Sequence, residues 1–107
     1  MKWYKDLFLG ERIAPDVKKI IRQINSKKLT PNVYVIAFSS NSQNLLDIIP
    51  TSNLLQHGYP KEDIRVIGLA LGITEAKELV RQIVDETYQN NGNVDVKQYL
   101  KSKWGDA

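Results

Sequence analysis

Apolar side chains recur along the chain with helical and extended periods, and these periods predict where its elements lie. The clearest helix follows Thr74, a residue type that favours the N-cap position. An earlier amphipathic helix is predicted over residues 15–28, because Pro15 suits a first helical turn. The apolar stripes consist of Ala76, Leu79, Val80, Ile83, Val84 and Tyr88 in the first case, and of Ile13, Val17, Ile20, Ile21 and Ile24 in the second.

Strands are predicted where apolar residues follow one another without a helical period. Residues 33–38 contain β-branched and aromatic side chains without alternation, which is typical of a strand buried on both faces. Residues 64–70, apolar apart from Arg65, predict the next strand. A weaker strand is predicted at residues 7–9, ending at Gly10. These three segments supply a small sheet.

Two further helices are predicted from their caps. Ser40 and Gln43 match a capping box, so we expect a helix between Ser42 and Gln56, kinked at Pro50. A last short helix is expected from Asp95 onward. The core face of the helix after Ser42 would consist of Leu45, Leu46, Ile48 and Ile49, followed by Leu54 and Leu55 on a second short piece.

The element order is therefore β-α-β-α-β-α-α, and each connection between strands is long enough for a parallel crossover. We predict an α/β protein with a small, single-layer, three-stranded and mainly parallel sheet flanked by helices, like half of a Rossmann-like or flavodoxin-like fold. One domain would cover residues 1–107, as the length favours. The strand orders 2-1-3 and 3-2-1 both remain open, with 3-2-1 favoured because residues 33–38 look buried on both faces.

Four segments also carry a resemblance to known sequences. They are the strand at 33–38, the run Asn-Leu-Leu-Asp-Ile-Ile at 44–49, the segment 63–70, and the helix containing Glu78-Leu79-Val80-Arg81. Together they resemble a family of short bacterial α/β proteins to which no function is assigned. The resemblance implies the fold class, and it implies no activity, cofactor or site residue.

Composition narrows the function classes. The 107 residues include no cysteine, which excludes disulfides, thiolate metal sites and a cysteine nucleophile. The longest apolar run, Val33–Phe38, is far too short to cross a bilayer, and Met1–Asp6 lacks the apolar core of a signal peptide. We therefore expect a cytoplasmic protein that has no membrane partner.

The net charge of +3 is unevenly distributed. Residues 1–31 contain eight basic and three acidic side chains, a balance of +5, whereas the remaining seven basic and nine acidic side chains give −2. A basic first third could face nucleic acid or an acidic protein, and it could equally be the solvated face of a helix. The candidate nucleic-acid contacts are Lys18, Lys19, Arg22 and Lys27.

Ligands of open parallel sheets bind at the carboxyl ends of strands, and this rule gives the best candidate pocket. Hydroxyls, an amide and free helix N–H groups there would suit a small ligand, a phosphate or a nucleotide. The glycine-rich and Lys-Ser/Thr patterns of phosphate-binding loops are missing, so plain helix capping is the alternative. The candidate residues are Ser39, Ser40, Asn41, Ser42, Gly72 and Thr74.

Residues with catalytic chemistry are scarce. His57 is the single histidine, and nothing in the sequence places a carboxylate beside it, so a turn residue is the simpler interpretation. Asp47 lies in an apolar run, where burial without a partner would be costly and would suggest function. We predict no catalytic residue, no metal site and no cofactor.

Aromatic residues gather at the two ends of the chain, where they could form an interface or cover the small sheet. They are Trp3, Tyr4, Phe8, Tyr99 and Trp104. We therefore expect a non-catalytic protein–protein interaction or accessory module, with self-association into a homodimer as one form of it. The alternatives are a small-ligand binder at the strand ends and, third, nucleic-acid binding through the basic helix.

Overall fold

The part of the chain that the structure describes forms one strand more than its apolar pattern predicts. The computed structural model describes residues 1–38, 46–59 and 64–104, with side chains described as far as residue 101. In chain order the elements are β1 (Lys2–Leu9), the 3-10 helix η1 (Ala14–Asp16), α1 (Val17–Asn25), β2 (Val33–Phe38), β3 (Leu46–Pro50), the 3-10 helix η2 (Thr51–Leu55), β4 (Arg65–Leu71), α2 (Ile73–Asn91) and α3 (Val96–Trp104).

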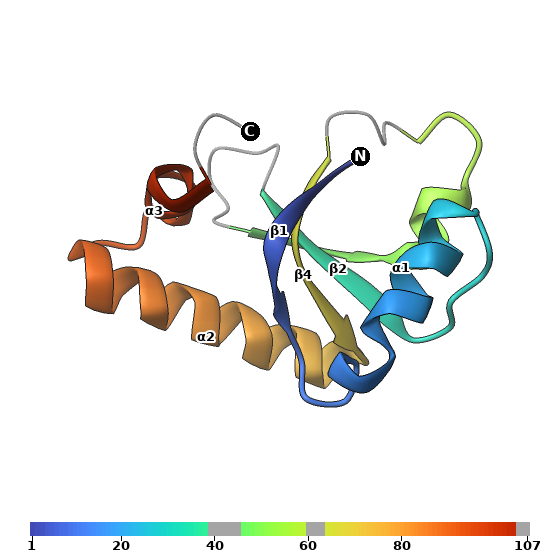
Figure 1. Ribbon diagram of the computed structural model, residues 1–107, viewed down its shortest axis with the longest axis horizontal. Coiled ribbons are helices and arrows are strands. Elements are labelled where there is room, and N and C mark those ends of the chain that lie inside the picture. Colours follow the sequence, from blue (N-terminus) through green and yellow to red (C-terminus); the bar gives the residue numbers. More distant parts are fainter. Residues whose placement is uncertain (39–45, 60–63, 105–107) are drawn as a thin grey trace.

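Within the described residues, the sheet has four strands in the order β1-β4-β2-β3 (Figure 1). β1 and β4 are parallel, whereas β2 runs antiparallel to both β4 and β3. The prediction of a three-stranded, mainly parallel sheet is therefore wrong, and so is the likeness to half of a Rossmann-like or flavodoxin-like fold. Both predicted strand orders are wrong as well, because β4 lies between β1 and β2.

The short connection between β2 and β3 explains part of the wrong prediction. Residues 39–45 alone separate β2 from β3, and a parallel crossover needs about a dozen residues or more. The two strands therefore pair antiparallel, with Ile36 opposite Ile48 and Phe38 opposite Leu46. An apolar run predicts that a strand forms, but it does not set the strand's direction.

The helix predicted between Ser42 and Gln56 is also wrong. Leu46–Pro50 is the edge strand β3, and Thr51–Leu55 is the short 3-10 helix η2. Leu46 and Ile48 pack into the core on one face of the sheet, while Ile49 packs on the other, as the two-residue period of a strand requires. Pro50 is tolerated because it ends an edge strand.

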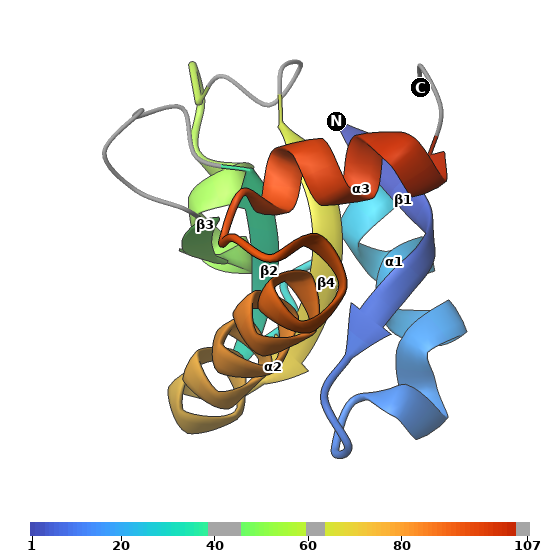
Figure 2. The ribbon, with the colours of Figure 1, turned by 90° about the vertical axis from the view of Figure 1, so that its left-hand side faces the viewer.

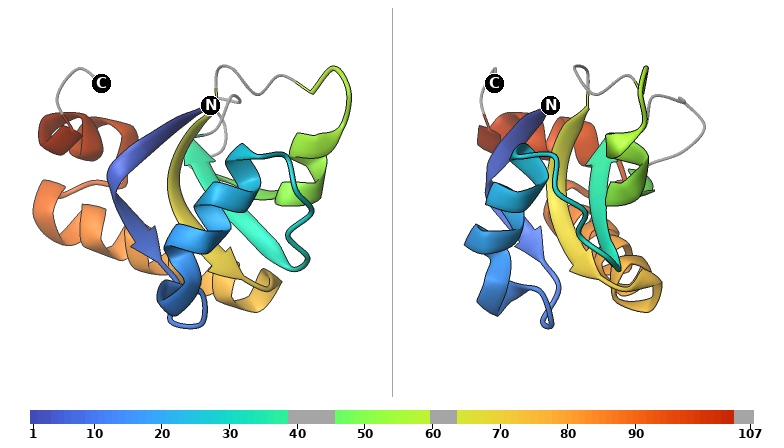
Figure 3. Two further views of the ribbon diagram at one scale, coloured as in Figure 1. Left: turned by 45° about the vertical axis from the view of Figure 1, so that its right-hand side comes forward. Right: turned by 90° about the vertical axis from the view of Figure 1, so that its right-hand side faces the viewer.

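Helices cover both faces of the sheet, and each face has its own core. α2 and α3 cover one face (Figure 2), where Ile36, Ile67 and Leu100 belong to one buried cluster. α1 covers the opposite face (Figure 3), where Val35 and Leu69 belong to a second cluster. β2 thus contributes to both cores, which confirms the prediction that residues 33–38 are buried on both faces.

Terminal aromatic side chains cover the sheet. Tyr4 of β1 and Tyr99 of α3 lie in the same buried cluster, although 95 positions separate them in the sequence. The rings of Tyr4 and Phe8 also stack, with centroids 6.4 Å apart. Trp3 is half-buried against the other core, and the side chain of Trp104 lies outside the described residues.

Candidate functional site

The residues predicted to bind a ligand do not share one end of the sheet. β2 and β4 are antiparallel, with Val33 opposite Leu71, so Gly72 and Thr74 lie beside the start of β2 rather than its end. The other predicted residues, Ser39, Ser40, Asn41 and Ser42, lie outside the described residues and follow the opposite end of β2. The site at Gly72 and Thr74 remains a prediction.

The carboxylate of Glu75 accepts hydrogen bonds from two backbone amides close to Gly72. Glu75, in the first turn of α2, accepts a hydrogen bond of 2.7 Å from the backbone N–H of Arg12 and one of 2.6 Å from that of Leu71. The carboxyl ends of β1 and β4 meet here, and Gly10 lies so close to Glu75 that a Cβ at Gly10 would overlap the carboxylate. Glu75 therefore joins the two strand ends, and its carboxylate uses two amide donors that a bound anion would otherwise need.

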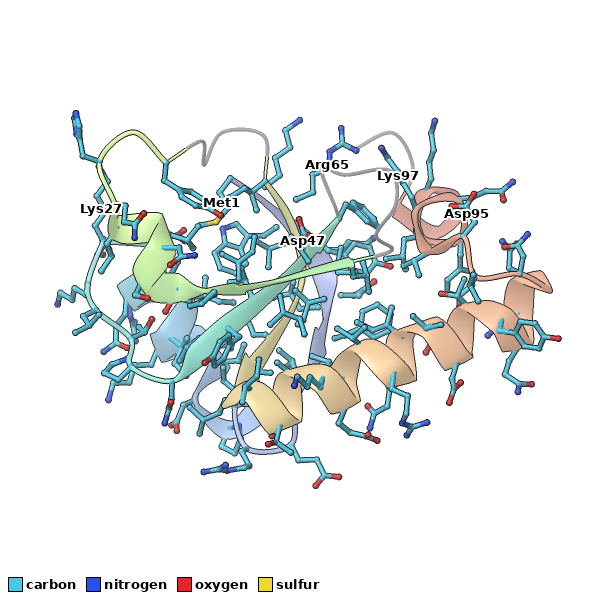
Figure 4. The ribbon with its side chains drawn as sticks, turned by 180° about the vertical axis from the view of Figure 1, so that it is seen from behind. Met1, Lys27, Asp47, Arg65, Asp95 and Lys97 are labelled. Atoms are coloured by element: carbon cyan, nitrogen blue, oxygen red, sulfur yellow. The ribbon has the colours of Figure 1, made fainter. Side chains whose placement is uncertain are left out.

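A hollow of about 240 Å³ is lined in part by Ile24 and Leu54, which belong to the core on the α1 face of the sheet. Apolar side chains form much of its surface, and Lys27 and Lys28 are its charged members. Figure 4 shows Met1 and Lys27 at the same end of the molecule, close to η2. The residues that line this hollow, called here the basic groove, are Met1, Ile24, Asn25, Lys27, Lys28, Thr51, Leu54 and Leu55.

Lys27 has an unusual backbone conformation. The Lys28 N–H donates to Gln23 C=O at 2.9 Å and the Lys27 N–H donates to Ile24 C=O at 3.0 Å, which together form a Schellman motif at the end of α1. Such a motif places its penultimate residue in the left-handed region, where glycine is favoured. Here that residue is Lys27, with φ of 59°.

A second hollow, of about 140 Å³, adjoins the basic groove and shares Thr51 with it. Between the two hollows, Thr51 donates to Thr30 C=O at 3.0 Å, and the two threonine hydroxyls are 2.6 Å apart. This bridge is buried and ties the loop after α1 to the start of η2. The residues that line this second hollow are Leu29, Thr30, Pro31, Asn32, Val33, Tyr34, Pro50, Thr51 and Ser52.

The predicted nucleic-acid residues lie on α1 and just after its end. Lys18, Lys19 and Arg22 are exposed on α1, which contains no acidic residue, and Lys27 follows the helix. Sequence reasoning found Lys27 but missed its groove, because the apolar floor comes from η2, which is distant in sequence. The lack of a glycine after the helix was a usable signal.

Other candidate residues carry little chemistry in the structure. His57 is exposed, and Asp47 is half-buried on β3 opposite Ala37. On α2, hydrogen bonds from the Arg81 guanidinium are the main reason that the pKa of Glu78 is lowered, and Glu78 raises the pKa of Arg81 in return. Because both side chains are exposed, this is a surface ion pair.

Searches of the described residues add two negative observations. None of their helices is long and apolar enough to cross a membrane. No group of three or more metal-ligating side chains is placed among them to hold an ion.

Comparison of the chain with protein-family models, curated proteins and solved structures gave no match.

Proposed function

We propose that this protein is a non-catalytic interaction module that binds an acidic segment of a partner protein in the basic groove. The observation that carries the proposal is Lys27, a non-glycine residue held at φ of 59° on the rim of an apolar hollow. Strained backbone positions of this kind gather at functional sites, where the surrounding structure holds them.

The conformation of Lys27 has a cost that glycine would avoid. A left-handed conformation costs an ordinary residue about 1–2 kcal/mol, chiefly through the contact between Cβ and the backbone. Nothing in the hydrogen bonding of the motif requires a side chain, because both bonds use the Lys27 and Lys28 backbone N–H groups. The ammonium group is the feature that glycine would lack, and Lys27 is one of the residues that line the groove.

The size of the groove favours a peptide over a cofactor. Pockets for drug-sized molecules have volumes of about 300–1,000 Å³. At about 240 Å³, the basic groove suits one apolar anchor side chain, whose flanking backbone remains outside. The exposed Leu55 and the half-buried Met1 provide apolar surface for that anchor, beside the buried Leu54.

Charge favours an acidic partner. Lys27 and Lys28 are both exposed, and no acidic residue lines the groove. The nearby helix α1 adds Lys18, Lys19 and Arg22, so the positive potential extends beyond the groove. Such a surface contributes more to partner selection and association rate than to affinity, and salt screens it.

The test separates the charge of Lys27 from its strain. The probe is the peptide EELTSS, followed by NMR shifts of the backbone amides of Lys28, Thr51 and Leu55. Lys27→Gln removes the charge and keeps the strain, whereas Lys27→Gly removes both. We expect both variants to weaken binding about two- to fivefold, the equivalent of one exposed ion pair, and Lys27→Gly alone to stabilise the fold by about 1 kcal/mol.

Lys77→Gln is the matched control, because it removes one exposed lysine from α2 on the other side of the sheet. The control should bind EELTSS like the wild type, and the neutral peptide QQLTSS should bind more weakly than EELTSS. Shifts that occur equally in all variants, or that fall outside the groove, would refute the proposal. Shifts that depend on protein concentration without peptide would show instead that a second copy occupies the groove.

A second candidate function rests on α1. Lys18, Lys19 and Arg22 are exposed on a helix without acidic residues, which suits the phosphates of nucleic acid. Fluorescence anisotropy with single- and double-stranded oligonucleotides would test it. Binding that weakens steeply with salt and is reduced by Lys19→Gln would support this function over the peptide.

A further inference from the structure

We infer that the partner segment is bound by two anchors, one in the basic groove and a second in the adjoining hollow, so that the site recognises an acidic–apolar–x–apolar pattern. This inference rests on the proposed function and specifies its partner. It is drawn from the two hollows that share Thr51 and from the exposed side chain of Leu29.

Consecutive residues of the loop that follows α1 line the two hollows. Lys27 and Lys28 line the first hollow, and the next residues of the chain, beginning with Leu29, line the second. The buried bridge joins Thr51, which lines both hollows, to Thr30, which lines the second. A segment that crosses this bridge would therefore enter one hollow on each side.

The spacing of the anchors follows from this adjacency. In an extended peptide, residues i and i+2 point to the same side, about 7 Å apart. Because Thr51 lines both hollows and Lys28 and Leu29 line one each, the two anchors have to be near neighbours in the partner's sequence. Positions i and i+2 meet this requirement, while the residue between them faces solvent.

The two hollows differ in charge and in size, which gives the pattern an asymmetry. No charged residue lines the second hollow, whereas two lysines line the first. The acidic residues of the partner therefore belong next to the first anchor. The second hollow is smaller, at about 140 Å³ against about 240 Å³, and its surface is more polar, so it fits a small anchor such as valine.

The loop between the hollows is held in place before any partner binds. Both of its ends adopt left-handed conformations without glycine, at Lys27 (φ 59°) and Asn32 (φ 64°). The carbonyl of Asn32 also accepts a hydrogen bond of 2.7 Å from the N–H of Gly72. A fixed loop lowers the entropy that binding has to overcome.

Leu29 is the residue that reports on the second hollow. Its side chain is 63% exposed, more than any other large hydrophobic side chain among the described residues. A partner that fills the second hollow would cover it. Because Leu29 contributes little to the core, Leu29→Ser should leave the fold intact, which a thermal melt would verify.

The test compares two peptides with the wild type, Leu29→Ser and Lys27→Gln. EELTVS carries both anchors and EELTSS carries the first alone, and each is also used in reversed sequence because a groove can accept either direction. We expect the two-anchor peptide to bind the wild type about tenfold more tightly than EELTSS, in one of the two directions. Leu29→Ser should remove that gain and leave the affinity for EELTSS unchanged.

The outcomes distinguish this inference from the function on which it rests. If both peptides bind with equal affinity and Lys27→Gln weakens both, the single-anchor groove stands and the two-anchor site is overturned. If neither peptide binds, the proposed function fails together with the inference. If the wild type self-associates in sedimentation and Leu29→Ser does not, the occupant is a second copy of this chain and the inference is again overturned.

Discussion

The Glu75 carboxylate should couple Gly10 to the start of α2 strongly enough for a double-mutant cycle to measure. Glu75 accepts hydrogen bonds from the backbone N–H groups of Arg12 and Leu71. The bond from Arg12 is exposed and the bond from Leu71 is partly buried. Hydrogen bonds to a charged group contribute about 1.5–3 kcal/mol when buried, and less where water can replace them. We therefore expect Glu75→Ala to destabilise the protein by about 2–4 kcal/mol.

Gly10→Ala should also be destabilising, for a steric reason. The new Cβ would overlap the Glu75 carboxylate, so the side chain would have to leave its two donors. Gly10 has no positive φ, so alanine itself fits the backbone at this position. The expected cost is about 1–3 kcal/mol in the wild type. Once Glu75 is alanine, the same substitution should lie between neutral and about 1 kcal/mol stabilising, because it restricts the unfolded chain.

Urea denaturation followed by circular dichroism would give the four stabilities of the cycle. The coupling between Gly10→Ala and Glu75→Ala should therefore be about 1–4 kcal/mol, whereas independent substitutions add to within about 0.5 kcal/mol. Glu78→Ala is the matched control, since it removes an exposed carboxylate from the same helix, and its effect should add to that of Gly10→Ala. An additive result for Gly10 and Glu75 would show that the carboxylate does not hold the strand ends together.

Three further predictions concern packing and charge elsewhere. Gly68→Ala should destabilise the fold by about 1–3 kcal/mol in urea titrations, because its Cβ would approach the backbone oxygen of Phe8 to 2.9 Å; an unchanged midpoint would contradict this. Leu100→Ala, at a fully buried position of α3, should cost about 2–5 kcal/mol, and a smaller loss would mean that α3 packs loosely. Arg81→Gln should raise the pKa of Glu78 toward its ordinary value in an NMR titration. Because the pKa of Glu78 is lowered in the wild type, the stabilisation by this pair is fully present above the ordinary carboxyl pKa. It is lost as the pH falls through the lowered pKa of Glu78. An identical titration of Glu78 in both proteins would contradict the pairing.

Local pattern was sufficient for the elements that carry their own signal. The helical stripe after Thr74 corresponds to α2, and the residues after Asp95 form α3, as predicted. The strands at 33–38 and 64–70 correspond to β2 and β4 within one residue at each end. α2 is long and strongly periodic, whereas β2 and β4 are short runs rich in β-branched residues. In each case residues close in the sequence therefore indicate which element forms.

The segment at 46–50 shows where local pattern fails. Apolar residues at 46, 48 and 49 fit one face of a helix and also fit the two faces of a strand. The choice depends on β2, which supplies a paired edge for Leu46–Pro50. The pairing depends on residues 34–38, which lie outside a sequence window of about 11–18 residues centred on residue 48.

The candidate site likewise combines features that the sequence shows with features that only the folded protein shows. The sequence alone determined that the first third of the chain is basic and that no glycine follows α1 at Lys27. Tertiary structure alone decided that Leu54 and Thr51 lie beside Lys27, and that Glu75 closes the strand ends at Gly10. Side-chain periodicity follows from backbone geometry within a few residues, whereas strand direction and pocket walls depend on contacts between residues far apart in the chain, which only the folded protein brings together.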